Sequence, residues 1–160
     1  MKKILILLIL IGGFETMNSQ NISKKDSLEI NAKINDWNKA WKIKDATLAS
    51  KWYSQDADFT NAFGFNMIGK NAIESYLTRV FNMDFVMVGN SEQTFVKLKY
   101  ISDNVILAIS TIERKGQMLS DGKELGTRQT THHRVLKKKE SWQIIAHLIS
   151  DARSIETNKH

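Results

Sequence analysis

The sequence contains no cysteine and no proline among its 160 residues. Without cysteine the chain can form no disulfide, supply no thiolate to a structural zinc ion and accept no lipid on sulfur. Without proline, a proline-rich linker or tail is excluded. A hydrophobic share of 42% and a charged share of 25% are ordinary for a globular protein. The length suits one domain with a core of its own.

Positive charge is not concentrated in one region, although the formal net charge is +6. Only Lys137, Lys138 and Lys139 form a run, and the other basic residues are scattered. A nucleic-acid-binding protein typically gathers basic residues on one face and interleaves them with aromatic side chains. We therefore expect no nucleic-acid partner, and we interpret the lysine run as a solvated hairpin turn.

The apolar run near the start is shorter than the roughly 20 residues that a membrane-spanning helix needs. Lys2 and Lys3 precede an aliphatic run from Ile4 to Ile11, an order typical of secretory signal peptides. We predict a signal peptide over residues 1–19 and a periplasmic or secreted protein with no stable membrane anchor. The alternative is that these residues form an N-terminal strand or an anchor.

Hydrophobic spacing predicts three helices in the first half of the chain. Asp26 is expected to cap the first helix, with Glu29 as its capping-box partner, after a flexible N-terminus over residues 20–26. The buried stripe of this helix recurs at helical spacing and comprises Ile30, Ile34, Trp37 and Trp41. Asp45 caps a short second helix whose apolar face comprises Leu48, Ala49, Trp52 and Tyr53. A third helix follows Gly69 and Lys70.

From about residue 84 onward the pattern is typical of strands. Residues 94–100 alternate between apolar and polar, residues 105–112 are nearly all apolar, and residues 125–136 and 142–150 form a last hairpin. A shorter strand, residues 56–60, precedes the third helix. Helices followed by antiparallel strands predict an α+β fold. Because residues 105–112 are apolar on both faces, we expect a homodimer that covers the sheet.

The order of these elements resembles the nuclear transport factor 2-like superfamily, which includes the ketosteroid-isomerase-like, SnoaL-like and calmodulin-kinase association domains. The resemblance covers residues 27–152 and leaves residues 153–160 as a flexible tail. It is carried by Gly69–Lys70 before the third helix and by the closing hairpin, with Arg128-Gln129-Thr130 followed by Trp142-Gln143-Ile144-Ile145. It implies three N-terminal helices packed on a curved, mostly antiparallel sheet that forms a cone-shaped pocket.

Strand alternation places Arg128, Thr130, His132 and Arg134 on one face of the closing hairpin. The resemblance favours this face as the pocket wall. Arg128 would then hold a carboxylate or an enolate oxygen, and His132 could exchange a proton near neutral pH. Asp58 is the other candidate acid–base group. The alternative for Arg128 is a structural ion pair with Asp58 or Glu113.

Aromatic residues are dense over residues 37–65 and predict an apolar small-molecule site. With Arg128 and Thr130, the predicted ligand-binding residues are Trp37, Trp41, Tyr53, Phe59, Asn61 and Phe63. Asn61 stands where the resemblance places the catalytic aspartate of ketosteroid isomerases. Tyr76 is interpreted as a core residue. Because His132 and His133 are adjacent on a strand, they face opposite ways, and we predict no metal site and no cofactor.

His147 is left out of the predicted site. Related domains carry a histidine in a W-x-I-x-x-x-H-x-S pattern, but here that position is Leu148 and the histidine comes one residue early. One step along a strand reverses the direction of a side chain.

These observations predict an exported domain that binds a small apolar or mildly anionic molecule. The alternative is a cofactor-free isomerase, lyase or cyclase that works by proton transfer. A buried general base would distinguish the two, because proton transfer needs a carboxylate or histidine of tuned pKa inside the pocket.

Overall fold

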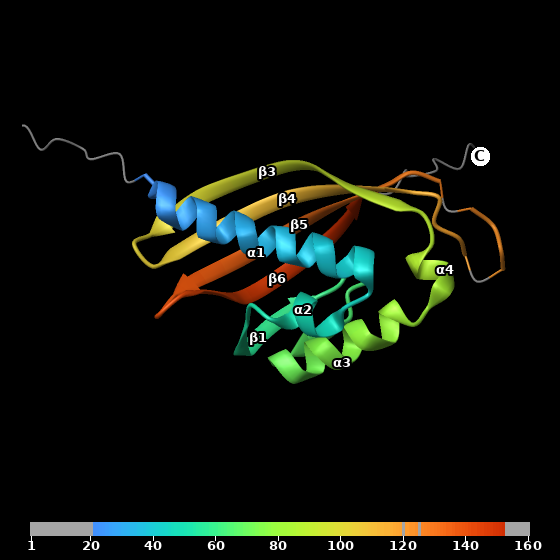
Figure 1. Cartoon of the computed structure of the whole chain (residues 1–160), viewed down its shortest axis with the longest axis horizontal. Helices are drawn as coiled ribbons and strands as arrows, with labels where there is room; N and C mark the ends of the chain where they lie inside the picture. Colours follow the sequence, from blue (N-terminus) through green and yellow to red (C-terminus); the bar gives the residue numbers. More distant parts are fainter. Residues whose placement is uncertain (1–20, 120, 125, 153–160) are drawn as a thin grey trace, which may run out of the picture.

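A computed structural model describes residues 21–119, 121–124 and 126–152. The predicted signal peptide, residues 1–19, and the predicted tail, residues 153–160, lie outside the described residues. The architecture is α+β, with helices packed on a curved, unclosed sheet (Figure 1). The helices are α1 (Lys24–Ile43), α2 (Ala46–Ser50), α3 (Lys70–Phe81) and α4 (Asp84–Met87). The predicted class is confirmed.

The sheet has six strands in the order β2-β1-β6-β5-β4-β3. They are β1 (Tyr53–Thr60), β2 (Asn66–Ile68), β3 (Asn90–Ser102), β4 (Val105–Lys115), β5 (Arg128–Lys138) and β6 (Trp142–Ala152). Strands β3 to β6 pair as an antiparallel meander, whereas β1 runs parallel to β6. The first strand of the domain, β1, therefore joins the sheet beside its last strand, β6.

Helix α1 begins earlier than predicted. Its N-cap is Ser23, whose hydroxyl accepts a hydrogen bond from the Asp26 backbone N–H at 3.0 Å. Asp26 instead lies in the first turn, where its carboxylate accepts from Lys138 Nζ and Trp142 Nε1, each at 2.7 Å. The Asp26 cap and the flexible start over residues 24–26 are thus wrong. Lys138 is not simply solvated, because it ties the β5–β6 turn to α1.

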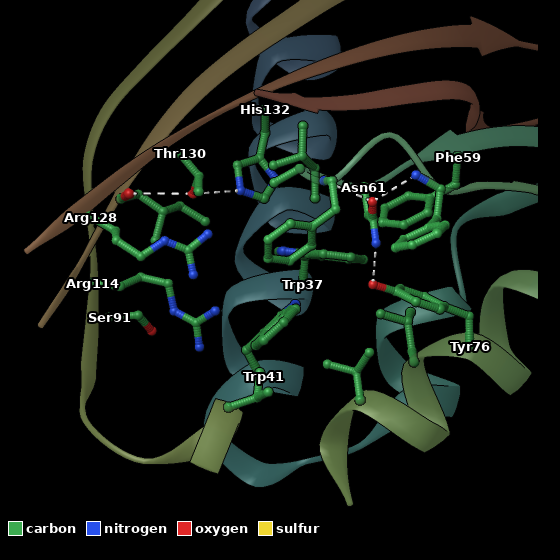
Figure 2. Close-up of a pocket in the computed structure, with 18 of the residues that line it drawn as sticks. Trp37, Trp41, Phe59, Asn61, Tyr76, Ser91, Arg114, Arg128, Thr130 and His132 are labelled. Atoms are coloured by element: carbon green, nitrogen blue, oxygen red, sulfur yellow. Dashed lines mark hydrogen bonds between the residues drawn. The ribbon is translucent and has the colours of Figure 1, made fainter. Parts of the chain in front are cut away.

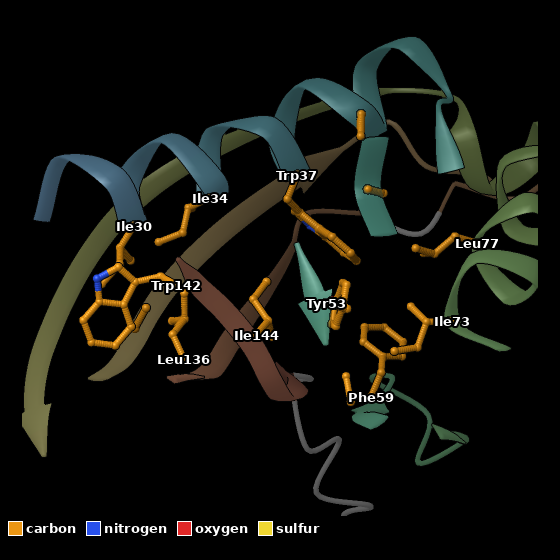
Figure 3. Close-up of a cluster of buried hydrophobic side chains, with 14 of the residues drawn as sticks. Ile30, Ile34, Trp37, Tyr53, Phe59, Ile73, Leu77, Leu136, Trp142 and Ile144 are labelled. Carbon is orange, nitrogen blue, oxygen red and sulfur yellow. The ribbon is translucent and has the colours of Figure 1, made fainter. Parts of the chain in front are cut away.

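The core lies between α1 and the concave face of the sheet (Figure 3). Ile30 and Ile34 point from α1 toward Leu136, Trp142 and Ile144 on β5 and β6, and all five are at most 3% exposed. Trp37, on the same face of α1, points toward Tyr53 and Phe59. Full burial of one such side chain contributes about 1.5–3 kcal/mol. This packing fixes α1 across the sheet, and with it the position of Trp37.

Helix α2 is shorter than its apolar pattern indicated. Asp45 caps it as predicted, accepting from the Leu48 N–H at 2.8 Å, but the helix ends at Ser50. Tyr53 begins β1 instead of sharing a helical face with Leu48. In the same way, β4 is fully buried on one face only, because Leu107 and Ile109 on the other face stay half-buried.

A register shift in β6 changes which of its residues face inward. Val135 on β5 pairs with Ala146, but the next residue, Leu136, pairs with Ile144, so Ile145 is the extra residue of a β-bulge. The bulge reverses the alternation, and both Ile144 and His147 are buried.

No described helix is long and apolar enough to cross a membrane.

Candidate functional site

A cavity of about 300 Å³ lies between α1, α3 and the concave face of the sheet (Figure 2). Its wall is mostly apolar, with polar side chains at two places. The lining residues used below are Trp37, Trp41, Phe59, Asn61, Tyr76, Arg114, Arg128, Thr130 and His132. This size is at the lower end of the range for small-molecule sites.

Trp37 forms the central wall of the cavity. Its ring contacts those of Trp41 and Phe59, with centroids 6.0 and 6.1 Å apart, and it meets the His147 ring edge-on at 5.1 Å. Trp37 is 2% exposed, so these contacts hold it in place. The exposed Phe63 lies at the cavity mouth, where its ring is 5.9 Å from the Arg128 guanidinium. A flat apolar molecule would meet a preformed aromatic surface here.

Two arginines form a cationic side of the cavity. Arg114 on β4 and Arg128 on β5 are direct cross-strand partners, and their guanidinium groups lie on the same side of Trp37 (Figure 2). Like charges placed directly opposite on neighbouring strands are destabilising. Arg128 forms an ion pair with Asp151, whose carboxylate lies 2.7 Å from its Nη2. The predicted alternative partners, Asp58 and Glu113, are not the ones it uses.

Arg114 has no such partner: no carboxylate among the described residues forms an ion pair with it. Burial, and then the charge of Arg128, lower the pKa of Arg114 to about 10, so it stays cationic at neutral pH. Its guanidinium lies 4.6 Å from the Trp41 ring centroid. The buried Trp41 Nε1–H also finds no acceptor among the described residues. A cation and a neutral donor are thus both left for a ligand.

Gln117 connects the cationic side to α4. Its side-chain oxygen accepts from Arg128 Nη1 at 3.1 Å, and its amide nitrogen donates to the Val86 carbonyl at 2.8 Å. Gln117 is 2% exposed. Nearby, a Cβ on Gly89 would lie 2.1 Å from the Lys115 carbonyl oxygen, so the chain after α4 closes tightly on the end of β4.

Behind the cavity wall runs a buried hydrogen-bonded chain whose direction is set by Arg134. Arg134 Nη2 can only donate, so His132 Nδ1, at 3.1 Å, is an acceptor and His132 carries its proton on Nε2. His147 Nε2 lies 3.0 Å from the same His132 Nδ1 and must donate to it. His147 Nδ1 then accepts from the Tyr53 hydroxyl at 2.5 Å. These directions make His132 neutral, and burial beside Arg134, which lowers the pKa of His147, keeps His147 neutral as well.

The pKa shifts of the two histidines and of Tyr53 agree with these hydrogen-bond directions. Burial, followed by the charge of Arg134, lowers the pKa of both His132 and His147 well below the ordinary histidine value. Burial likewise raises the pKa of Tyr53. The remaining His132 proton, on Nε2, faces the Thr130 hydroxyl at 3.2 Å. His132 lines the cavity but has no free lone pair, which makes it a poor general base.

Asn61 and Tyr76 form the second polar region of the cavity wall. Asn61 Oδ1 accepts from the backbone N–H groups of Phe63 and Phe65, at 2.9 and 3.0 Å, and fixes the loop after β1. Its amide nitrogen donates to the Tyr76 hydroxyl at 2.7 Å. Asn61 thus lies in the wall as predicted, whereas Tyr76, interpreted as core, lines the cavity.

Two predicted site residues lie elsewhere. Asp58 is exposed on the outer face of β1 and is hydrogen-bonded to Asn66, because its neighbours Ala57 and Phe59 are the ones buried. The prediction of Asp58 as an acid–base group is therefore wrong. Tyr53 is buried behind His147 and does not line the cavity, so its ligand-binding assignment is wrong too. None of the described lining residues is a carboxylate.

The structure brings together the other predicted residues. Trp37, Trp41, Phe59, Asn61, Phe63, Arg128, Thr130 and His132 all lie in the cavity wall. Sequence reasoning missed Arg114, although the alternation that buries Ile106, Ala108, Ser110 and Ile112 continues to it. Among the described residues, no group of three or more His, Asp or Glu side chains could hold a metal ion.

No family model and no curated protein matches the chain. Solved structures do. An uncharacterized protein with a cystatin-like fold from Caulobacter vibrioides aligns with a TM-score of 0.72 at 16% identity, over 81% of this chain and 91% of that one. An NTF2-like protein of unknown function from Pseudomonas putida KT2440 aligns at 0.68 and 19% identity, over 87% and 95%.

A ketosteroid isomerase-like protein from Erwinia carotovora atroseptica aligns with a TM-score of 0.68 at 14% identity, over 82% of this chain and all of that one (100%). Such identities establish a shared fold and leave the chemistry of each site to its own residues. The helices on a curved open sheet, the parallel β1–β6 pair and these neighbours together identify the nuclear transport factor 2-like fold.

Proposed function

We propose that the chain is an exported small-molecule-binding domain whose cavity holds an apolar molecule bearing a carboxylate or a similar anion. The observation that carries the proposal is Arg114, a cation in an aromatic cavity without a carboxylate partner among the described residues. Arg128, directly opposite, already uses Asp151. A ligand anion would relieve the repulsion between the two arginines and accept from Arg114 and the Trp41 N–H.

Proton-transfer catalysis has less support. Of the two predicted acid–base groups, Asp58 and His132, His132 is the one that lines the cavity. Both of its ring nitrogens are already hydrogen-bonded. A neutral histidine that already donates from Nε2 can orient a ligand but cannot take a proton from it. Binding without turnover therefore fits the polar groups of the cavity better than an isomerase, lyase or cyclase does.

Calorimetry with matched aryl carboxylates and aryl carboxamides tests the proposal. The two compounds share shape, and only the carboxylate carries a charge. We expect the carboxylate to bind at least about tenfold more tightly, since a charge-assisted hydrogen bond contributes about 1.5–3 kcal/mol. Arg114→Met should remove this preference. Arg79→Met, at an exposed arginine of α3, is the matched control and should keep it.

Equal affinity for the two compounds in the wild type would contradict the proposal, as would a preference that survives in Arg114→Met. Detection of turnover with either compound is not expected. The mature N-terminus of protein from its native host, determined by sequencing, tests the export part separately, and a full-length cytoplasmic product would contradict it.

A further inference from the structure

The Asn61–Tyr76 pair lies across the cavity from the two arginines, with Trp37 between them (Figure 2). The orientation of the Asn61 amide is determined by the loop that follows it. Its oxygen accepts two backbone N–H groups, so the amide nitrogen must be the atom that faces Tyr76. With 6% of Asn61 exposed, this arrangement is fixed by burial as well.

The direction of this hydrogen bond leaves one proton of Tyr76 unused. The tyrosine oxygen accepts from Asn61 at 2.7 Å, so the O–H itself must point to a different acceptor. Within the described parts of the chain no side chain or carbonyl takes that proton. Tyr76 lines the cavity, and its ring rests 5.9 Å from that of Phe59. The cavity is therefore offered a hydroxyl donor held in a fixed position.

The surroundings of this donor select against a charged group. The Phe59 ring packs on that of Tyr76, Leu77 also lines the cavity, and the arginines lie on the far side of Trp37. A charged group in such a place would lose its hydration without gaining an opposite charge. A neutral carbonyl, hydroxyl or ether oxygen loses far less on leaving water, and one hydrogen bond compensates it.

We propose that Tyr76, oriented by Asn61, is a second polar subsite that binds a neutral oxygen of the ligand. The anion end of the ligand rests on the proposed function above. Together the two ends define the ligand class as oxo- or hydroxy-substituted aryl or alicyclic carboxylates, with the flat apolar body against Trp37 and Phe59.

An asparagine at position 61, unlike an aspartate, directs the Tyr76 hydroxyl proton into the cavity, because its amide nitrogen donates to the Tyr76 oxygen. An aspartate at position 61 could still accept the two loop N–H groups with its carboxylate. Its other oxygen, however, would accept the Tyr76 proton and turn that proton away from the ligand. Asn61→Asp is therefore predicted to behave like Tyr76→Phe at the level of ligand choice.

The test compares para-acetylbenzoate with para-isopropenylbenzoate by titration calorimetry, together with the corresponding pair of longer biphenyl carboxylates. Within each pair a C=O replaces a C=CH₂ of the same shape, so only the acceptor differs. In the pair whose length lets the carboxylate reach Arg114 and the acetyl oxygen reach Tyr76 at the same time, the acetyl compound should bind about tenfold more tightly to the wild type. This is the discrimination expected of one buried hydrogen bond. Tyr76→Phe and Asn61→Asp should each bring that ratio close to one.

Tyr100→Phe is the control, because it removes a hydroxyl from β3 that bonds to Asp103 at the surface. It should keep the wild-type ratio. Equal binding within both wild-type pairs, or an acetyl preference that persists in Tyr76→Phe, would overturn the subsite while leaving Arg114-dependent binding of both carboxylates intact. Failure of all four compounds to bind would instead overturn the anion-binding function and the ligand class with it.

Discussion

The buried histidine pair predicts a steep loss of stability between pH 7 and pH 5. His132 and His147 are 4% and 2% exposed and hydrogen-bonded to each other, with Arg134 beside them. Burial and Arg134 lower the pKa of each histidine in the folded state. The unfolded chain therefore binds more protons than the folded one below the ordinary histidine pKa of about 6.5, and stability falls as the pH falls.

The magnitude follows from proton linkage. If neither histidine is charged in the folded state at pH 5, each one costs about 1.9 kcal/mol on going from pH 7 to pH 5, and the pair costs about 4 kcal/mol. This is a large part of a typical unfolding free energy of about 5–15 kcal/mol. The hydrogen bond from Lys138 is the main reason that the pKa of Asp26 lies below its usual range. Asp26 therefore loses its contribution to the unfolding free energy only at lower pH. The pH window therefore reports mainly on histidine.

Urea unfolding at pH 7, 6 and 5, followed by far-ultraviolet circular dichroism, measures the effect. His147→Gln retains one acceptor and one donor for Tyr53 and His132 and should roughly halve the slope. His133→Gln, on the opposite face of β5, should leave the steep slope in place because both buried histidines remain. A change below about 1 kcal/mol between pH 7 and pH 5 would show that the folded protein already carries a charged histidine, and the assigned hydrogen-bond directions would then be wrong.

Three further predictions concern stability and assembly. Arg128→Met should lower the unfolding free energy by about 2–4 kcal/mol, because it breaks the Arg128–Asp151 ion pair, whose side chains are only 15% and 3% exposed; urea unfolding measures this, and a wild-type midpoint would contradict it. Gly89→Ala should cost more than about 1 kcal/mol in the same assay, because the added Cβ meets the Lys115 carbonyl at φ +89°. The outward face of the sheet should form a homodimer that Ile109→Lys dissociates in sedimentation equilibrium, and a wild-type mass near 18.3 kDa or slightly less would refute the dimer.

Period-two alternation correctly placed Arg128, Thr130 and His132 on one face of β5, because that strand is regular throughout. The family resemblance, and not the alternation, selected this face as the cavity wall. The same rule, applied to residues 56–59, would have placed Asp58 outside, since Ala57 and Phe59 are the apolar members of the alternation. It would also have extended the inward face of β4 to Arg114. The positions of Asp58 and Arg114 are therefore both predictable from the alternation of their strands.

Other features could not be obtained from the pattern. The bulge at Ile145 depends on how β6 matches β5 across the sheet, so the inward position of His147 has no local signal. Tyr53 follows a short helix closely enough that its apolar character fitted the helix as well as a strand. The free proton of Tyr76 depends on the direction of the Asn61 amide, which is set by two backbone groups of a loop.

The parallel pairing of β1 with β6 also makes folding depend on contacts between residues far apart in the sequence. The Tyr53–His147 hydrogen bond joins residues 94 positions apart, and the Trp142–Asp26 bond that holds α1 to the sheet spans 116. Contacts of such sequence separation require long loops to be closed at an entropic cost, which slows folding. Both of these hydrogen bonds require a residue of β6, the last strand. A chain that lacks β6 can form neither bond, and Trp37 and Phe59 lose the His147 ring against which they pack.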